Sequence, residues 1–232
     1  MDYHQAAVAL CTGTGLEIGP LSSPAPLRAK VIYADICDKK RAAEILMGLE
    51  GGPFYDLDKL IEPQIILQAP HFFIPLPNGE LNFVYSSHVL EHAPNTIAAI
   101  FDQLRCVKTG GIVYFVVPNR RGTYDHRRPA TPVSQIVRRF EQRQFTFSRE
   151  EASELLWGTS GHAHYERKIL EKLDEIHEGG SGAHHFTVFT PSTVLGVVDY
   201  VSTRFNCELV YFAADDPIHI HVALKKMGEA HN

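Results

Sequence analysis

The stretch IVYFVVP at residues 112–118 limits the fold of this 232-residue chain more than any other feature. It is too uniformly apolar for a strand with one face in water. It is also far shorter than the roughly 20 apolar residues that span a membrane. Such a run is typical of a central strand in a parallel sheet whose two faces are both covered. We therefore expect an α/β protein.

Short apolar runs alternate with helical patterns along the rest of the chain. We expect strands at 16–19, 30–35, 64–67, 81–87 and 112–118 and a helix at 38–48. A further helix should start after Asn95, a favourable N-cap, and end at Gly110–Gly111. Thr190 should cap the penultimate helix, and two strands, 207–215 and 217–226, close the chain as a hairpin. This alternation predicts an open, doubly wound sheet.

The pattern changes between residues 119 and 185. Residues 119–149 carry eight arginines against only Asp125 and Glu141, and residues 150–178 mix both charges in helical stretches. We interpret 119–185 as a lid inserted after the fifth strand, within one domain that spans residues 1–232. Ligands of doubly wound sheets bind at the carboxyl ends of the strands, which such a lid would cover.

Composition indicates the setting in which the protein works. The chain is 44% apolar and 21% charged, which is ordinary for a globular protein, and its net charge of −5 disfavours a general nucleic-acid binder. The four cysteines form no C-x-x-C pair, and the first residues lack the pattern of a secretory signal. We expect a soluble cytoplasmic protein without membrane contacts, and the sequence leaves open whether it forms a homodimer.

The sequence GLEIGP at residues 15–20 marks a candidate cofactor turn. The dinucleotide fingerprint G-x-G-x-x-G fails because Ile18 stands where the third glycine should be. A carboxylate such as Glu17 suits a cofactor with an ammonium group and would repel a pyrophosphate. Asp35 ends the second strand, where an acid commonly bonds ribose hydroxyls, although Asp35 or Asp38 could instead cap a helix. The alternative for Glu17 is a plain turn with an acidic end.

Two longer segments connect this turn to a known family. FVYSSHVLEHAPN at 83–95 and LRCVKTGGIVYFVVPNRR at 104–121 resemble the class I S-adenosylmethionine-dependent methyltransferases, especially the small-molecule, type 11-like group. TYDHRRPATP at 123–132 and GAHHFTVFTPST at 182–193 are similar to a subgroup associated with sugar or glycan modification. The resemblance implies a Rossmann-like, seven-stranded, mostly parallel sheet with a C-terminal hairpin. It also implies S-adenosyl-L-methionine as cofactor and O-methylation of a small hydroxylated substrate, such as a sugar or nucleotide-sugar.

The resemblance further implies a set of cofactor-binding residues at the strand ends: Glu17, Gly19, Pro20, Asp35, Ile36, Phe72, Ser87 and His88. The first three would line the methionine end, and the last two would face the sulfonium. Two departures from the family pattern occur. Leu21 stands where a glycine is common, and QAPHFF at 68–73 lacks the acidic residue that often contacts adenine, which leaves Phe72 or Phe73 to pack there.

Transfer to a hydroxyl also needs a base, and histidine is suited to that role near neutral pH. The candidates are His185, His184 and His126, with at most one of the adjacent pair pointing inward. His92 is a further candidate for the base and a candidate substrate-binding residue, but we expect it rather to satisfy backbone groups or to pack against the lid. His219 and His221 should lie on a strand face away from the site.

The arginines after the fifth strand are candidate substrate ligands: Arg120, Arg121, Arg127 and Arg128. They could grip a phosphate or carboxylate of an anionic or glycosylated small molecule, or pair with the acids of 150–178. No metal site is expected, since His162 and His164 belong to no H-E-x-x-H or Cys/His cluster. A non-catalytic binding or scaffold protein that keeps the same fold is the alternative function.

Overall fold

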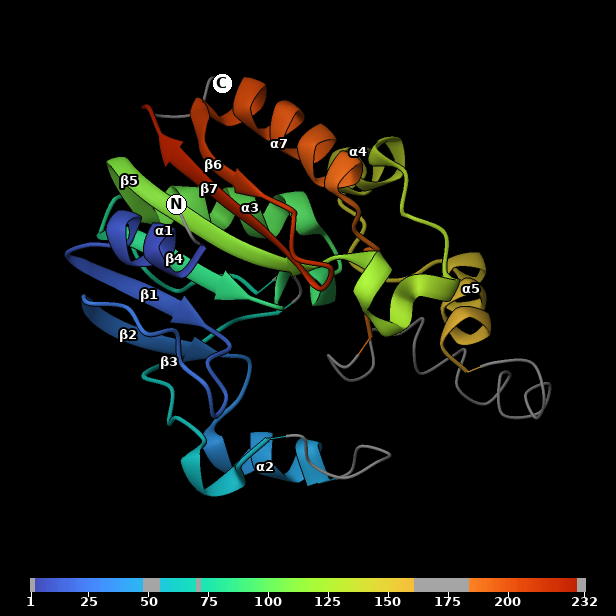
Figure 1. The fold of residues 1–232 in the computed structure, drawn as a ribbon, viewed down its shortest axis with the longest axis horizontal. Helices are drawn as coiled ribbons and strands as arrows, with labels where there is room; N and C mark the ends of the chain where they lie inside the picture. The colour runs from blue at the N-terminus through green and yellow to red at the C-terminus, as the bar shows by residue number, and fades with distance from the viewer. Residues whose placement is uncertain (1–2, 48–54, 70–71, 161–183, 229–232) are drawn as a thin grey trace.

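The computed structural model describes residues 3–47, 55–69, 72–160 and 184–228 (Figure 1). They form one seven-stranded sheet in the order β3-β2-β1-β4-β5-β7-β6. The strands are β1 (Thr14–Ile18), β2 (Lys30–Asp35), β3 (Ile65–Ile66), β4 (Leu81–Ser87), β5 (Val107–Pro118), β6 (Cys207–Ala213) and β7 (His219–Lys226). Strands β1 to β5 pair in parallel, and β7 is antiparallel to both of its neighbours. The predicted doubly wound sheet with a closing hairpin is therefore confirmed.

The strand order reverses between β1 and β4, because the chain moves outward from β1 to β3 and then returns to the other side of β1. Open α/β sheets bind ligands at such a switch point, outside the carboxyl ends of the strands. In Figure 1 the arrowheads of β1, β4 and β5 point to the same side, which is where the insert lies. The topology thus locates the site before any side chain is considered.

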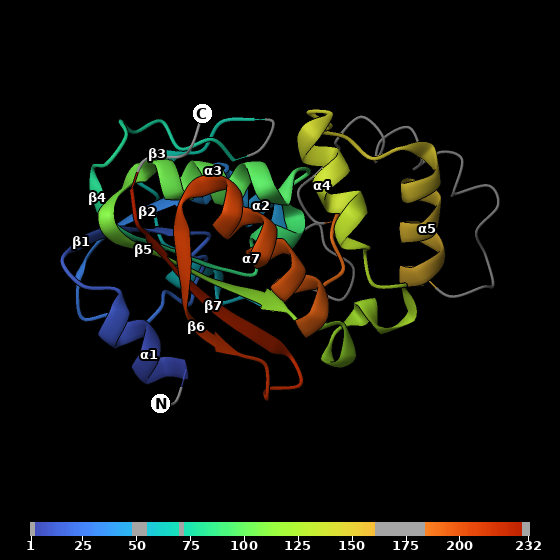
Figure 2. The same ribbon diagram turned by 90° about the horizontal axis from the view of Figure 1, so that it is seen from above.

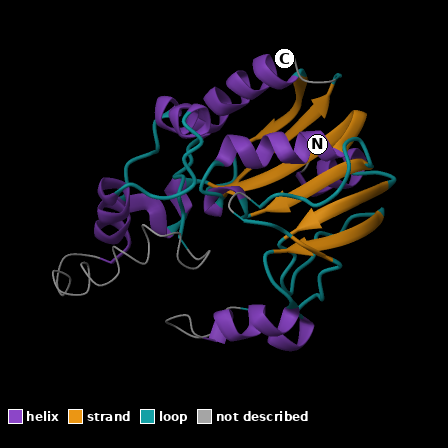
Figure 3. Ribbon diagram, turned by 180° about the vertical axis from the view of Figure 1, so that it is seen from behind, coloured by secondary structure: helices purple, strands orange, loops and turns teal. Residues whose placement is uncertain are grey.

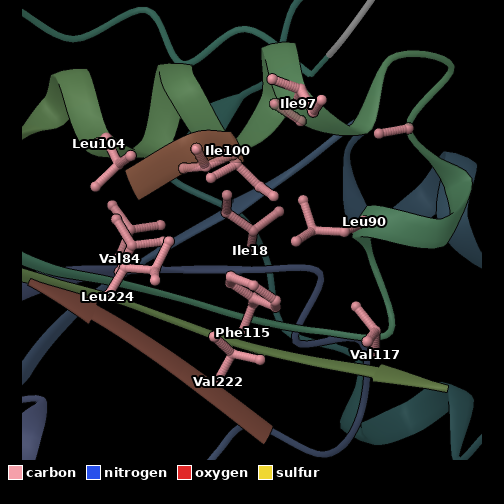
Figure 4. Close-up of a cluster of buried hydrophobic side chains, with 14 of the residues drawn as sticks. Ile18, Val84, Leu90, Ile97, Ile100, Leu104, Phe115, Val117, Val222 and Leu224 are labelled. Carbon is pink, nitrogen blue, oxygen red and sulfur yellow. The ribbon is translucent and has the colours of Figure 1, made fainter. Parts of the chain in front are cut away.

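Two apolar layers hold the sheet between helices (Figure 2). On one face, α3 (Thr96–Cys106) and α7 (Pro191–Phe205) pack on the alternate side chains of the central strands. Figure 4 shows Ile97, Ile100 and Leu104 of α3 pointing down onto Val84 and Phe115. On the other face, α1 (Tyr3–Leu10) covers a smaller cluster around Tyr114. Residues 111–118 of β5 are all buried, which explains their uninterrupted apolar sequence.

The helix caps are the local features that the sequence predicts best. The Asn95 side chain accepts the Ala98 N–H at 3.1 Å, and Thr190 accepts the Thr193 N–H at 3.2 Å with Pro191 in the first turn. Asp38 accepts the Arg41 N–H at 2.7 Å at the start of α2 (Lys39–Met47). Asp38 therefore takes the capping role, and Asp35 is left for another one.

The predicted boundary between α3 and β5 is wrong. The helix ends at Cys106 rather than at Gly110–Gly111, and the strand begins at Val107. A register irregularity between Leu81 and Phe83 takes up the extra residues of β5, and Gly110 adopts a φ of +81° there. The two glycines thus lie in a bulge within the strand and do not end the helix.

Between residues 119 and 160 the insert is helical and lies beyond the strand ends, as Figure 3 shows. Its described part contains α4 (Val133–Glu141), α5 (Arg149–Ser160) and two short 3-10 turns, Arg120–Gly122 and Tyr124–Arg127. The predicted helical stretch at 165–180 falls outside the described residues, as do His162 and His164. Each helix in the described part of the chain is too short or too polar to cross a lipid bilayer.

Candidate functional site

Glu17 lies at the switch point with one carboxylate oxygen unused. The residue is 3% exposed, its Oε1 accepts the Ala25 N–H at 2.7 Å, and its Oε2 has no hydrogen-bond partner among the described residues. Burial raises the pKa of Glu17 from 4.5 to about 7, against the smaller opposite effect of the Ala25 N–H. A buried acceptor of this kind fits a ligand that brings a positive charge, and an ammonium group is one.

The turn after β1 needs its glycine. Gly19 has a φ of +68°, and a β-carbon there would stand 2.9 Å from Cγ2 of Val89. Its N–H donates to the Ala34 carbonyl at 2.9 Å, which ties the turn to β2. Pro20 follows as a buried residue. Residues 19–29 then form a loop, without the helix that usually follows the first strand of a doubly wound sheet.

Leu21 occupies a conformation that favours glycine, with a φ of +44°. We expect Leu21→Gly to be more stable than Leu21→Ala by about 1 kcal/mol, because alanine keeps the β-carbon that the left-handed region disfavours. At positions with a negative φ, the alanine variant is usually the more stable of the two. Urea unfolding of the two variants measures the difference. An alanine variant as stable as the glycine variant would show that Leu21 carries no strain.

The ends of β2 and β3 carry the predicted ribose and adenine residues. Asp35 Oδ1 accepts the Ile36 N–H at 2.7 Å, and burial raises the pKa of this carboxyl. Ile36 is 41% exposed, a large apolar side chain next to an acid at the strand ends. Phe72 is half-buried against the core, whereas the ring of Phe73 lies under the guanidinium of Arg105 at 4.9 Å. Of these two aromatic residues, it is therefore Phe73 and not Phe72 that makes this cation–π contact.

A second group of polar residues surrounds the end of β4. Its centre is Glu91 in the turn Leu90–His92, whose carbonyl accepts the N–H of Phe186 at 2.7 Å and of Thr187 at 3.3 Å. These two bonds join segments that lie more than 90 residues apart in the sequence. They bring His185 to the same place as His88 and His92. We call Glu91, His92, His185 and Asp125 the polar cluster.

His185 and Asp125 form a buried pair. His185 Nδ1 lies 2.5 Å from Asp125 Oδ2, and the two residues are 5% and 1% exposed. Burial by itself would raise the pKa of Asp125, but His185 and Arg128 hold it below its usual value. A carboxylate that fixes one ring nitrogen leaves the other nitrogen available for a proton or a ligand. The prediction that only one of His184 and His185 points inward agrees with this burial.

Glu91 is the least satisfied charged side chain of the cluster. It is fully buried, and neither carboxylate oxygen has an aligned hydrogen bond among the described residues. The nearest groups are His88 Nδ1 at 3.4 Å and His92 Nε2 at 3.9 Å, both from Oε1. Burial opposes ionisation, yet His88, His92 and His185 together hold the pKa of Glu91 below its usual value. The carboxylate is thus short of hydrogen-bond partners among the described residues.

His92 lies beside His185 with their rings edge to face, 4.7 Å between centroids. Its Nδ1 lies 3.2 Å from the His184 carbonyl, so the backbone of His184 supports the cluster. Burial lowers the pKa of His92. His126 lies elsewhere: it is exposed, and its Nδ1 is 3.0 Å from the Thr123 carbonyl.

Of the two alternatives for the four arginines, Arg128 takes the second, pairing with an acid of 150–178 instead of facing the substrate. Arg128 is 2% exposed, and it donates to Asp125 Oδ1 and the His185 carbonyl, both at 2.9 Å, and to Glu154 at 3.3 Å. It is a structural residue of the insert, since a buried guanidinium needs such partners. Arg120 is half-buried and donates to the Arg128 carbonyl. Arg121 and Arg127 are exposed.

His219 and His221 lie nearer the site than expected. They line a cavity of about 250 Å³ together with Tyr85 and Ser87, and the ring of His219 stands edge-on to that of His88 at 5.2 Å. The antiparallel direction of β7 explains this, because its first residues lie beside the last residues of β5. The alternation within β7 predicts a shared face but not which end of the sheet it reaches.

Sequence comparison agrees with this geometry. The family profile described as a methyltransferase domain matches residues 10–160. That range includes β1 to β5 and the first part of the insert. Comparison with curated proteins finds no match.

Solved structures share the fold at low sequence identity. The structure of the Haloferax volcanii Trm112 methyltransferase activator with the putative methyltransferase gives a TM-score of 0.51 at 9% identity, covering 99% of this chain and 89% of that chain. A putative Zn-dependent alcohol dehydrogenase from Rhodobacter sphaeroides gives 0.51 at 16% identity, covering 97% and 89%. An S-adenosylmethionine-dependent methyltransferase from Aquifex aeolicus gives 0.46 at 10% identity, covering 96% and 88%.

Proposed function

We propose which molecule accepts the methyl group. The chain belongs to the family of methyltransferase domains, and it is an S-adenosylmethionine-dependent methyltransferase. The acceptor is a hydroxyl group of a small anionic molecule, such as a sugar or nucleotide-sugar. The observation that carries the proposal is the buried Asp125–His185 pair beside the end of β4, next to the switch point.

The residues at the strand ends suit the cofactor. Glu17 Oε2 is a buried acceptor that no described residue bonds, which fits the amino group of S-adenosylmethionine. Asp35 is not used as a helix cap and would bond the ribose, while the exposed side chain of Ile36 would pack beside adenine with Phe72. Ser87 and His88 would lie near the sulfonium. When bound, the cofactor supplies an activated methyl group, so the protein needs only to position the acceptor and take its proton.

The polar cluster supplies what a hydroxyl acceptor requires. Asp125 accepts from His185 Nδ1, and the ring can then act on the acceptor through its other nitrogen. His185 is the catalytic residue in this proposal, and Asp125 is a positioning residue. His184 contributes its carbonyl to His92, and His126 has no part in it.

The proposed substrate is a small molecule rather than a nucleic acid. The exposed guanidinium groups of Arg121 and Arg127 lie in the two 3-10 turns that follow β5 and would bind a phosphate or carboxylate. The net charge of −5 supports a small ligand, because nucleic-acid binding relies on many phosphate contacts.

Calorimetry with S-adenosylmethionine and S-adenosylhomocysteine tests the cofactor site. We expect binding by the native chain and an affinity at least about tenfold lower for Asp35→Ala, which loses a charged hydrogen bond to the ribose. Asp199→Ala, an exposed carboxylate on α7, is the control and should bind as the native chain does. Equal affinities for the native and Asp35→Ala proteins would place the cofactor elsewhere.

The acceptor is tested with labelled S-adenosylmethionine and a panel of nucleotide-sugars, sugar phosphates, neutral sugars and RNA. We expect label to move to a hydroxyl of an anionic sugar and not to RNA. Transfer to RNA alone would overturn the proposed acceptor while leaving the cofactor site in place.

A further inference from the structure

The polar cluster contains an arrangement that general-base catalysis does not require. One oxygen of Glu91, one nitrogen of His92 and one nitrogen of His185 all lie within 4.8 Å of one another. We propose that these three side chains bind a divalent transition-metal ion, and that Zn²⁺ is a suitable ion with which to test it.

The carboxylate of Glu91 is poorly satisfied by hydrogen bonds. Glu91 is completely buried, and both of its oxygens lack a hydrogen bond within the described part of the chain. The imidazoles of His88 and His92 lie 3.4 and 3.9 Å from Oε1, too far for short hydrogen bonds, and native proteins bond a buried carboxylate fully or use it to coordinate a metal. The buried guanidinium groups of Arg128 and Arg139 do not fill this need, because they bond Asp125 and Glu151 respectively.

The imidazoles of His92 and His185 are each held through Nδ1 by an oxygen atom. His185 Nδ1 is held by the Asp125 carboxylate, and His92 Nδ1 by the His184 carbonyl. Histidines that bind metals almost always donate their other N–H to a carboxylate or a backbone carbonyl, which fixes the tautomer and aims the free nitrogen. Both histidines here have such a partner, and in both Nε2 is the nitrogen left for an ion.

The ligand set indicates the class of metal. Two imidazoles and one carboxylate suit zinc, iron, nickel or cobalt, whereas calcium and magnesium prefer oxygen ligands. Ligands about 2 Å from a tetrahedral ion lie about 3.3 Å apart, so His92 Nε2 and Glu91 Oε1, now 3.9 Å apart, would need only a small shift. Three protein ligands leave at least one coordination position open, as in catalytic rather than structural zinc sites.

An ion at this place would change the part that His185 plays in the proposed function. The Nε2 lone pair would bind the metal, and the metal would lower the pKa of a hydroxyl group bound at the open position. The hydroxyl proton would pass to solvent, and the oxygen would bond the methyl carbon while the carbon–sulfur bond breaks. This consequence rests on the proposed function, whereas metal binding itself does not.

Metal binding is measured without any reference to turnover. The purified protein is freed of metal with a chelator and titrated with Zn²⁺ by calorimetry, and Co²⁺ is used as a spectroscopic probe. We expect about one equivalent of Zn²⁺, a visible Co²⁺ absorption band and a higher melting temperature with Zn²⁺. Glu91→Gln and His92→Ala should each bind at least about 100-fold more weakly. Asp125→Asn should bind about 10- to 100-fold more weakly, because it acts through His185.

Two comparisons decide the outcome. His126→Ala removes an exposed histidine outside the polar cluster and should bind Zn²⁺ as the native protein does. Glu91→Gln removes a buried charge and should remain folded, which circular dichroism checks. If native protein and Glu91→Gln bind Zn²⁺ equally, or neither binds it, the metal site is overturned. Methyl transfer by metal-free protein would overturn the catalytic part alone, and metal binding without S-adenosylmethionine binding would overturn the proposed function alone.

Discussion

His185→Ala is expected to lower kcat about 10³-fold while the Kd of S-adenosylmethionine stays within about twofold. A positioned acid–base group contributes about 10²- to 10⁴-fold to a rate, and the contacts of His185 to Asp125 and His92 involve no predicted cofactor residue. Initial-rate kinetics with a saturating acceptor measure kcat, and calorimetry measures cofactor binding. A variant that keeps most of its turnover would mean that another group receives the proton.

Asp125→Asn tests the other member of the His185–Asp125 pair. The imidazole remains, but the amide cannot stabilise its charge or fix its tautomer as the carboxylate does, so we expect kcat to fall about 10²-fold with little change in the acceptor KM. A purely structural role would instead alter KM, cofactor affinity and stability together. Glu141→Gln is the matched control, because it makes the same chemical change on the exposed surface of α4. Measuring bound metal in His185→Ala then separates the two roles of the ring. If His185 is only a general base, the variant keeps any metal that the native protein binds. If His185 is a metal ligand, the variant loses that metal.

The sheet could be predicted because its signals are local. The buried run at 112–118, the caps Asn95 and Thr190, and the glycine-limited turn after β1 each depend on neighbouring residues in the sequence. The end of α3 at Cys106 could not be predicted from the sequence, for a physical reason. Two adjacent glycines stop a helix in most contexts, but here the pairing of β5 with β4 is strong enough to extend the strand through them with a bulge.

The polar cluster could be predicted only in part, since it depends on contacts between distant segments. The motif SHVLEH contains Glu91, but nothing in its spacing says that the carboxylate is buried or that His185 lies next to it. His162 and His164 belong to no short metal-binding motif, whereas HVLEH at 88–92 has the spacing H-x-x-E-H, the inverse of H-E-x-x-H, and is the sequence signal that points to Glu91 and His92. Arg128 shows the same limit, because only its partner Asp125 is near in sequence, while Glu154 is 26 and the His185 carbonyl 57 residues away.

Glu17→Gln is expected to have opposite effects on stability and on cofactor binding. The folded protein raises the pKa of Glu17 from 4.5 to about 7, so between these values it holds a proton that the unfolded chain releases. The stabilisation from this proton is complete below about pH 4.5 and is lost as the pH rises through about 7. At pH 8 the ligand-free protein therefore carries a buried charge. One pKa unit corresponds to about 1.4 kcal/mol, so this charge destabilises the protein by at most about 3 kcal/mol.

Glutamine removes that destabilisation because it cannot ionise. We expect Glu17→Gln to have a free energy of unfolding about 2 kcal/mol above the native protein at pH 8 and close to it at pH 5, as measured by urea unfolding at both pH values. Glu208→Gln, an exposed carboxylate on β6, should leave the stability unchanged at both. An equal effect of Glu17→Gln at pH 5 and pH 8 would show that the gain comes from something other than ionisation.

The same substitution should weaken S-adenosylmethionine binding about 100-fold at pH 8. Glu17 Oε2 is buried and has no hydrogen-bond partner in the part of the chain that the structure describes, and an ammonium group would neutralise the charge that destabilises the protein. Loss of a charge-assisted hydrogen bond of this kind corresponds to about 1.5–3 kcal/mol, and 2.7 kcal/mol is about 100-fold in Kd. The native protein should likewise bind the cofactor more weakly as the pH falls below about 7, whereas Glu17→Gln should show no such dependence. A variant that is both more stable and a weaker binder would indicate that the buried charge of Glu17 is maintained for the cofactor rather than for the fold.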